Sequence, residues 1–127
     1  MSAPESLAGH RVLVVEDEEL IGLMLVDVLE ELGAAVAGPA GTVAEALELV
    51  AQDTPTGALL DLSLRGETVY PVADRLLQLG VPYLFITGYG QGHLVARHGH
   101  APVLTKPFGA DQLVAALARA GWMSGLV

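Results

Sequence analysis

Side chains that can do chemistry stand at the ends of several apolar runs. Glu16 and Asp17 follow RVLVV, Asp61 follows GALL, Thr87 closes VPYLFIT and Lys106 follows APVLT. Carboxylates bind hard cations such as Mg²⁺, an aspartate can attack phosphorus, and hydroxyl or ammonium groups can bind phosphoryl oxygens. Lys106 is the only lysine, beside five arginines and fifteen acidic residues. These residue types together favour phosphoryl transfer.

Each residue has a definite role if phosphoryl transfer is the chemistry. An aspartate of this group is the expected nucleophile, and Asp17 and Asp61 are expected to bind Mg²⁺, with Glu16 in reserve. Ser63, two residues after Asp61, can add its backbone carbonyl as a further metal ligand. One Mg²⁺ and the charge of Lys106 bring three carboxylates close to neutrality. We therefore expect Lys106 to be the counter-ion of the cluster and the clamp for the phosphoryl group.

Alternating strand and helix patterns must position these side chains. Short β-branched runs indicate strands, and apolar residues spaced three or four apart indicate helices. The predicted strands are 11–16, 34–38, 57–62, 81–87 and 101–105. The predicted helices are 20–32, 42–52, one with Pro71 in its first turn and Gly80 past its end, a weak one at 93–98, and one capped by Asp111. We expect Gly38-Pro39 to turn the chain and LRGET to form a loop.

The order βαβαβαβαβα predicts an α/β fold with a doubly wound, five-stranded parallel sheet. In such a sheet the site lies outside the carboxyl ends of the strands, where the chemical residues stand.

Composition limits the class of protein. A chain of 127 residues predicts one domain over 1–127, with its core at about 11–121. The net charge of −9 argues against nucleic acid and anionic membranes as partners. No cysteine is present, which excludes disulfides and thiolate metal sites. Neither a membrane-spanning run nor a secretion signal is visible, so we expect a cytoplasmic protein.

The motifs VLVVEDE, LLDLSL, ITG and LTKPF, in this order and spacing, resemble the CheY-like receiver domain of two-component response regulators. The resemblance implies a flavodoxin-like (βα)5 fold with strand order 2-1-3-4-5. It also implies a cis peptide bond between Lys106 and Pro107.

The same resemblance assigns roles to individual residues. It implies that Asp61 is the phosphoacceptor and that Glu16 and Asp17 form the acidic pocket for Mg²⁺. It implies that Thr87 is the switch hydroxyl and that Lys106 is the lysine found throughout the family.

The stretch YLFITGYG further resembles the FAT GUY subgroup of single-domain receivers from alphaproteobacteria. That subgroup is associated with histidine kinases of HWE or HisKA2 type. Val103 stands where receivers usually have an aromatic, and Ile86 replaces a small residue before the switch hydroxyl. Tyr89 is the nearby aromatic that can take over the switch.

The implied function is a single-domain response regulator of a phosphorelay. It accepts a phosphoryl group from a histidine kinase and either switches the binding of a downstream protein or acts as a phosphate sink. No enzymatic activity is expected beyond its own phosphoryl transfer and dephosphorylation.

Two other functions stay open. A phosphatase of the haloacid dehalogenase type also combines Asp, Thr, Lys and Mg²⁺. In this chain, however, Ser63 stands where its second aspartate would be, and the nucleophile lies on the third strand. A pseudo-receiver that binds partners without phosphorylation is kept open by Ile86 and Val103.

The segment after Thr87 carries two further patterns. GYGQG lacks the spacing of a nucleotide-binding loop and is interpreted as a flexible switch loop. His93, His98 and His100 do not share a helical face, so we expect solvated histidines rather than a metal cluster.

Overall fold

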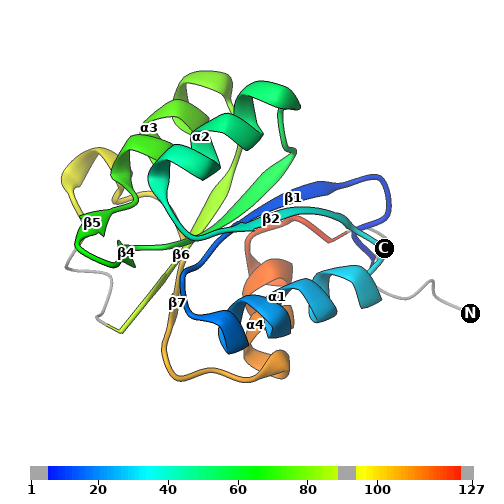
Figure 1. The fold of residues 1–127 in the computed structure, drawn as a ribbon. Helices are drawn as coiled ribbons and strands as arrows, with labels where there is room; N and C mark the ends of the chain where they lie inside the picture. Colours follow the sequence, from blue (N-terminus) through cyan, green and yellow to red (C-terminus); the bar gives the residue numbers. More distant parts are fainter. Residues whose placement is uncertain (1–5, 89–93, 124–127) are drawn as a thin grey trace, which may run out of the picture.

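The computed structural model describes residues 6–88 and 94–123, which form a central sheet between two layers of helices (Figure 1). The parallel strands of the sheet are β1 (Arg11–Val15), β2 (Ala35–Ala40), β3 (Gly57–Asp61), β6 (Tyr83–Thr87) and β7 (Val103–Thr105). Their order is β2-β1-β3-β6-β7. This is the expected order 2-1-3-4-5, so the flavodoxin-like α/β fold is confirmed. The cis peptide between Lys106 and Pro107 is confirmed as well.

Helices cover both faces of the sheet. They are α1 (Glu19–Glu31), α2 (Val43–Gln52), α3 (Tyr70–Leu79) and α4 (Ala110–Arg119), with a short 3₁₀ helix, η2 (Ala96–His98). Helices α2 and α3 lie on one face, and α1 and α4 on the other (Figure 1). Because neighbouring side chains of a strand point to opposite faces, Leu13 and Val15 pack with the first pair, and Val12 and Val14 with the second. The strands are therefore continuously apolar.

Several helix ends follow the expected local signals. Thr42 is the N-cap of α2, and its hydroxyl oxygen accepts the backbone N–H of Glu45 at 3.1 Å. Pro71 lies in the first turn of α3, and Gly80 ends that helix with a φ of 72°. Pro fits the first turn because no helical partner is needed for its missing N–H, and Gly adopts the left-handed conformation without strain.

The predicted cap of the last helix was wrong. Gly109, not Asp111, is the N-cap of α4. The backbone N–H of Gly109 donates to Gln112 Oε1 at 2.8 Å, and this bond lets the helix begin before Asp111. Asp111 lies instead in the first turn, where its charge is favourable with the helix dipole.

The second strand does not end at Gly38-Pro39 as predicted. Strand β2 continues to Ala40, with a register shift against β1 between Leu13 and Val15. Gly38 has a φ of 100°, and a Cβ atom there would lie 2.6 Å from the Val14 carbonyl oxygen, so glycine alone fits. The carbonyl oxygen of Ala40, the last residue of β2, accepts the backbone N–H of Glu16 at 2.9 Å. This hydrogen bond holds the chain where it leaves β1.

Two segments differ from the predicted loops and helices. LRGET contributes to a small hairpin, β4 (Ser63–Leu64) and β5 (Glu67–Thr68), because its two-residue loop lets the flanking residues pair. Within the predicted helix at 93–98, the structure shows only the short 3₁₀ helix η2 (Ala96–His98) in the residues that it describes. Residues 89–93, which include Tyr89 and His93, lie outside the described residues. Among the helices that are described, none is long and apolar enough to cross a membrane.

Candidate phosphoryl-transfer site

The site residues lie where the strands of the sheet end. Asp61 is the last residue of β3, Glu16 follows β1, Thr87 ends β6 and Lys106 follows β7. The backbone N–H of Lys106 donates to the Thr87 carbonyl oxygen at 2.8 Å, which extends the pairing of β6 with β7 to this edge. Asp61, Glu16 and Thr87 are buried. The parallel topology thus gathers carboxylates, a hydroxyl and an ammonium at one edge.

Lys106 pairs with several carboxylates at once. Its Nζ donates to Asp61 Oδ2 at 2.9 Å and to Glu18 Oε1 at 3.3 Å, and lies 3.7 Å from Glu16 Oε1. Burial disfavours the ammonium, but the hydrogen bond to Asp61 and the charges of Asp61 and Glu16 outweigh it and raise the pKa of Lys106. The sole lysine is therefore the charged counter-ion of the cluster, as the sequence predicts.

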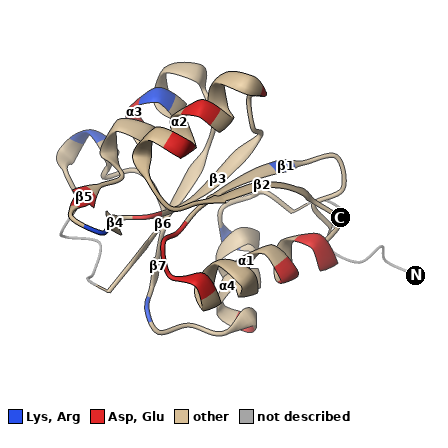
Figure 2. Ribbon diagram, in the orientation of Figure 1, with Lys and Arg blue, Asp and Glu red and all other residues tan. Residues whose placement is uncertain are grey.

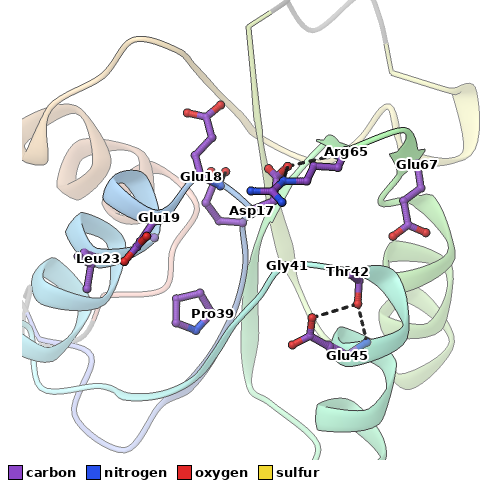
Figure 3. A pocket seen from close by; sticks show the side chains of 12 residues that line it. Asp17, Glu18, Glu19, Leu23, Pro39, Gly41, Thr42, Glu45, Arg65 and Glu67 are labelled. Atoms are coloured by element: carbon purple, nitrogen blue, oxygen red, sulfur yellow. Dashed lines mark hydrogen bonds and ion pairs between the residues drawn. The ribbon is translucent and has the colours of Figure 1, made fainter.

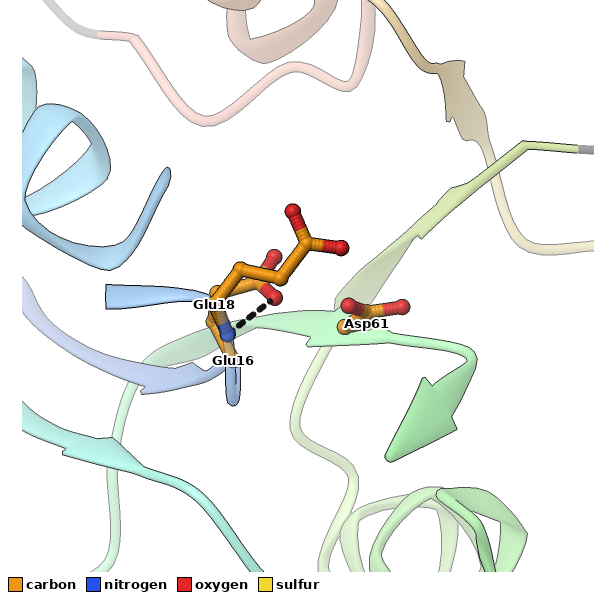
Figure 4. A group of neighbouring side chains, drawn as sticks. All are labelled: Glu16, Glu18 and Asp61. Atoms are coloured by element: carbon orange, nitrogen blue, oxygen red, sulfur yellow. Dashed lines mark hydrogen bonds between the residues drawn. The ribbon is translucent and has the colours of Figure 1, made fainter. Parts of the chain in front are cut away.

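Glu16, Glu18 and Asp61 form a compact acidic group (Figure 4). One carboxylate oxygen from each lies within 4.8 Å of the others. Burial, reinforced by the neighbouring Asp61 carboxyl, raises the pKa of Glu16 to about 8, although the Glu18 N–H and Lys106 lower it. Without a cation, burial and the neighbouring Asp61 thus disfavour the charged form of the Glu16 carboxyl.

The donor set fits a hard divalent cation. Glu16 Oε1 is buried, has no hydrogen-bond partner among the described residues and has Lys106 Nζ at the longer distance of 3.7 Å, so this oxygen can accept a cation as a further partner. Carboxylate oxygens are the ligands that Mg²⁺ prefers, and the described geometry offers those of Glu16, Glu18 and Asp61. When bound, Mg²⁺ would offset their repulsion and the negative charge of an incoming phosphoryl group. Glu18 was not assigned to the site from sequence, although it belongs to the acidic run before α1.

The other two predicted ligands face different partners. Asp17 lies apart from the compact group, with its Oδ2 accepting the backbone N–H of Arg65 at 3.2 Å and lying 3.5 Å from Arg65 Nε. The backbone N–H of Ser63 donates to Asp61 Oδ1 at 3.2 Å. The assignments of Asp17 and of the Ser63 carbonyl as metal ligands stay predictions. Arg65 was missed, and its place four residues after Asp61 was the available signal.

A pocket of about 480 Å³ opens beside Asp17. It lies between the start of α1, the segment before α2 and the β4–β5 hairpin (Figure 3). Glu18, Glu45, Glu67 and Arg65 are among the side chains that line it. The pocket gives solvent and ions a way to the acidic edge.

His98 is not the solvated side chain that the sequence predicts. Its ring is fully buried, with Nε2 2.7 Å from Asp74 Oδ1 and Nδ1 2.5 Å from the Tyr83 hydroxyl. Because a carboxylate only accepts, Nε2 donates to Asp74, and Nδ1 can accept from Tyr83. Tyr70 stacks on the same ring at 5.6 Å. His100 is exposed, as expected.

The strand order and the acidic edge with its paired lysine define a receiver domain. The chain matches the response regulator receiver domain family over residues 12–118 and belongs to that family. The match confirms the resemblance to receiver domains that the motifs indicated.

Three relatives illustrate the similarity. The solution structure of SdrG from Sphingomonas melonis Fr1 is 40% identical with a TM-score of 0.77, covering 91% of this chain and 98% of that one. The transcriptional regulatory protein PdtaR of Mycobacterium tuberculosis is 32% identical, over 89% of this chain and 57% of that protein. The phyllosphere-induced regulator PhyR of Methylorubrum extorquens is 33% identical, over 86% of this chain and 42% of that protein. The chain thus spans about half the length of these two curated relatives.

A second structure of SdrG is of its BeF3-activated conformation. It is 41% identical with a TM-score of 0.75, and covers 91% of this chain and 98% of that one.

Proposed function

We propose that the protein accepts a phosphoryl group on Asp61 from a histidine kinase, with Mg²⁺ as the required cation. The observation that carries this proposal is the position of Asp61. It is the buried carboxylate at the end of the central strand, hydrogen bonded to the only lysine and grouped with two further carboxylates. Its nucleophilic oxygen therefore lies beside both a fixed positive charge and oxygen ligands for a cation.

The proposed step transfers the phosphoryl group from a phosphohistidine of the kinase to the Asp61 carboxylate. A carboxylate oxygen of Asp61 attacks phosphorus, an O–P bond forms, and the N–P bond of the kinase phosphohistidine breaks. The released imidazole nitrogen keeps the electron pair and takes up a proton. Lys106, already 2.9 Å from Asp61 Oδ2, can follow the new phosphoryl oxygens, because its flexible stem carries a charge that needs no particular orientation.

The proposed donor is a kinase of HWE or HisKA2 type, on the strength of YLFITGYG. The BeF3-activated conformation of SdrG supports activation by a phosphoryl group, since BeF3 is a mimic of that group. The PdtaR and PhyR names describe regulators, which supports an output through a downstream protein, with a phosphate sink as the other outcome. Thr87 and Tyr89 are the proposed switch residues, and Tyr89 lies outside the described part of the chain.

The proposal predicts that Asp61→Asn abolishes phosphorylation. The amide has the shape of the carboxylate but is not a nucleophile toward phosphorus, so the variant should fold and take no label from a phosphorylated kinase or acetyl phosphate. Asp27→Asn is the matched control, because Asp27 is exposed on α1. Stoichiometry is measured by intact mass or radiolabel, with Mg²⁺ and with EDTA.

Wild-type labelling of Asp61→Asn would refute the proposed acceptor. Repeated turnover of p-nitrophenyl phosphate would favour the phosphatase alternative, whereas one stoichiometric event per chain would exclude it. A wild-type protein that takes no label from either donor would instead be a pseudo-receiver.

A further inference from the structure

The β4–β5 hairpin has an unusual residue in its loop. Leu64 pairs with Glu67, so Arg65 and Gly66 form the two-residue connection. Both have positive φ angles, 20° for Arg65 and 86° for Gly66. Two-residue hairpins with positive φ at both positions favour Asn, Asp or Gly at the first. The backbone therefore does not favour arginine at this position, and its side chain needs another explanation.

That side chain lies against Asp17. The backbone N–H of Arg65 donates to Asp17 Oδ2 at 3.2 Å, and Arg65 Nε lies 3.5 Å from the same oxygen (Figure 3). The Asp17 side chain is 13% exposed, whereas that of Arg65 is 83% exposed. Asp17 is thus a nearly buried carboxylate whose partner side chain is mostly exposed to solvent.

The other end of the hairpin is also anchored. Glu67 Oε2 accepts the backbone N–H of Val43, at the first residue of α2, at 3.1 Å. Because both ends are held, the hairpin keeps Arg65 at Asp17 rather than leaving it on an unattached loop.

The contact with Arg65 gives Asp17 a different partner from the other carboxylates at the strand ends. The oxygens that lie within 4.8 Å of one another belong to Glu16, Glu18 and Asp61, while Asp17 pairs with Arg65. A cation that takes Asp17 Oδ2 as a ligand would lie close to the Arg65 guanidinium, whose positive charge opposes it. We propose that Arg65 is a positioning residue that competes with the divalent cation for Asp17 and so weakens cation binding. This inference rests on the proposed function, because it assumes the Mg²⁺ of that proposal and adds Asp17, predicted from the sequence, to its ligands.

The expected effect is modest and measurable. An exposed ion pair contributes little, and the repulsion between Arg65 and a divalent cation is screened by solvent. Loss of the guanidinium should therefore tighten Mg²⁺ binding about threefold to tenfold.

The test compares three forms of the full chain by isothermal titration with Mg²⁺. Arg65→Asn removes the charge and suits a backbone with positive φ. Arg75→Gln removes the same charge from an exposed position on α3, away from the site. We expect Arg65→Asn to bind Mg²⁺ about threefold to tenfold more tightly than wild type, and Arg75→Gln to stay within about twofold.

A second measurement uses the wild type alone. The Arg65 Nε–Hε resonance should shift as Mg²⁺ is added, with the same midpoint as the calorimetric titration. Either an unmoved resonance at saturation or equal affinities of the two variants would overturn the role of Arg65. If wild type still takes label on Asp61 in that case, the proposed function stands. If wild type binds no Mg²⁺ and takes no label, both are overturned.

Discussion

At the residue scale, Glu16 is the most perturbed group of the site. It is buried, and one of its oxygens has no hydrogen-bond partner among the described residues. A buried carboxyl next to another carboxyl is disfavoured as an anion, so its pKa rises to about 8. Cation binding must therefore release a proton from Glu16, or be opposed by it.

This pKa predicts how the stability of the cation-free protein depends on pH. Between the ordinary value of 4.5 and about 8, the folded state holds a proton that the unfolded state has released. The contribution is thus fully present below 4.5 and is lost as pH rises through about 8. Across this range, the free energy of unfolding of wild type in EDTA should fall by up to about 5 kcal/mol more than that of Glu16→Gln, at about 1.4 kcal/mol for each pH unit.

The measurement is urea unfolding in EDTA at several pH values. Gln keeps the size of the side chain and cannot titrate, so it isolates the charge. Parallel pH curves for wild type and Glu16→Gln would contradict the prediction.

At the scale of elements, hydrogen bonds of one buried side chain, His98, hold η2 against α3 and β6. His98 bonds to Asp74 of α3 and to the Tyr83 hydroxyl of β6, and Arg97 pairs with Asp74 at 2.8 Å. The hydrogen bond from Arg97, together with that from His98, outweighs desolvation and lowers the pKa of Asp74. This network secures the chain directly before β7, which leads to Lys106.

Tyr83→Phe should weaken the attachment of η2 to β6, because it removes the hydrogen bond between Tyr83 and His98. The change leaves the ring in place but removes the hydroxyl, so a fully buried nitrogen of His98 loses its partner. Such a loss typically costs about 1–3 kcal/mol of unfolding free energy. Denaturant unfolding of wild type and variant measures it. Equal stability of wild type and Tyr83→Phe would mean that water or another donor replaces the hydroxyl.

The sequence predicts the elements better than it predicts their contacts. Continuous apolar runs identify β1 and β3, and Pro71 and Gly80 mark the ends of α3, because these signals are local. The burial of His98 is not local, since its partners Asp74 and Tyr83 lie 24 and 15 residues away. The extension of β2 past Pro39 likewise depends on pairing with β1.

At the scale of the whole molecule, the parallel sheet concentrates negative charge at one edge. Figure 2 shows acidic segments at the turn from β1 into α1, with a basic segment directly after β7. The edge is predictable, because the carboxyl ends of parallel strands meet there. The place of Lys106 beside the carboxylates is predictable too, because it is the only lysine and follows a strand that ends at this edge. The pairing of Arg65 with Asp17 is not, because the two residues are 48 apart in sequence and meet only in the folded chain.

This concentration of charge predicts that Mg²⁺ stabilises the whole fold. The unfolded chain does not hold Glu16, Glu18 and Asp61 together, so a cation that uses this group binds the folded state alone. At a concentration one hundred times its dissociation constant, such a ligand adds about 2.7 kcal/mol. For a domain of this size each kcal/mol raises the Tm by about 3–5 °C. Scanning calorimetry with Mg²⁺ should therefore show a rise of about 8–13 °C at that saturation.

General screening of the net charge of −9 also raises the Tm of an acidic protein, so ionic strength must be matched with NaCl. Asp61→Asn is the second control, because it removes one carboxylate of the group without changing the shape of the side chain. Its response to Mg²⁺ should shrink toward that of NaCl alone, while Asp27→Asn should respond like wild type. A wild-type Tm that rises equally in Mg²⁺ and in NaCl of the same ionic strength would show that only diffuse screening acts, and that the acidic edge holds no specific cation.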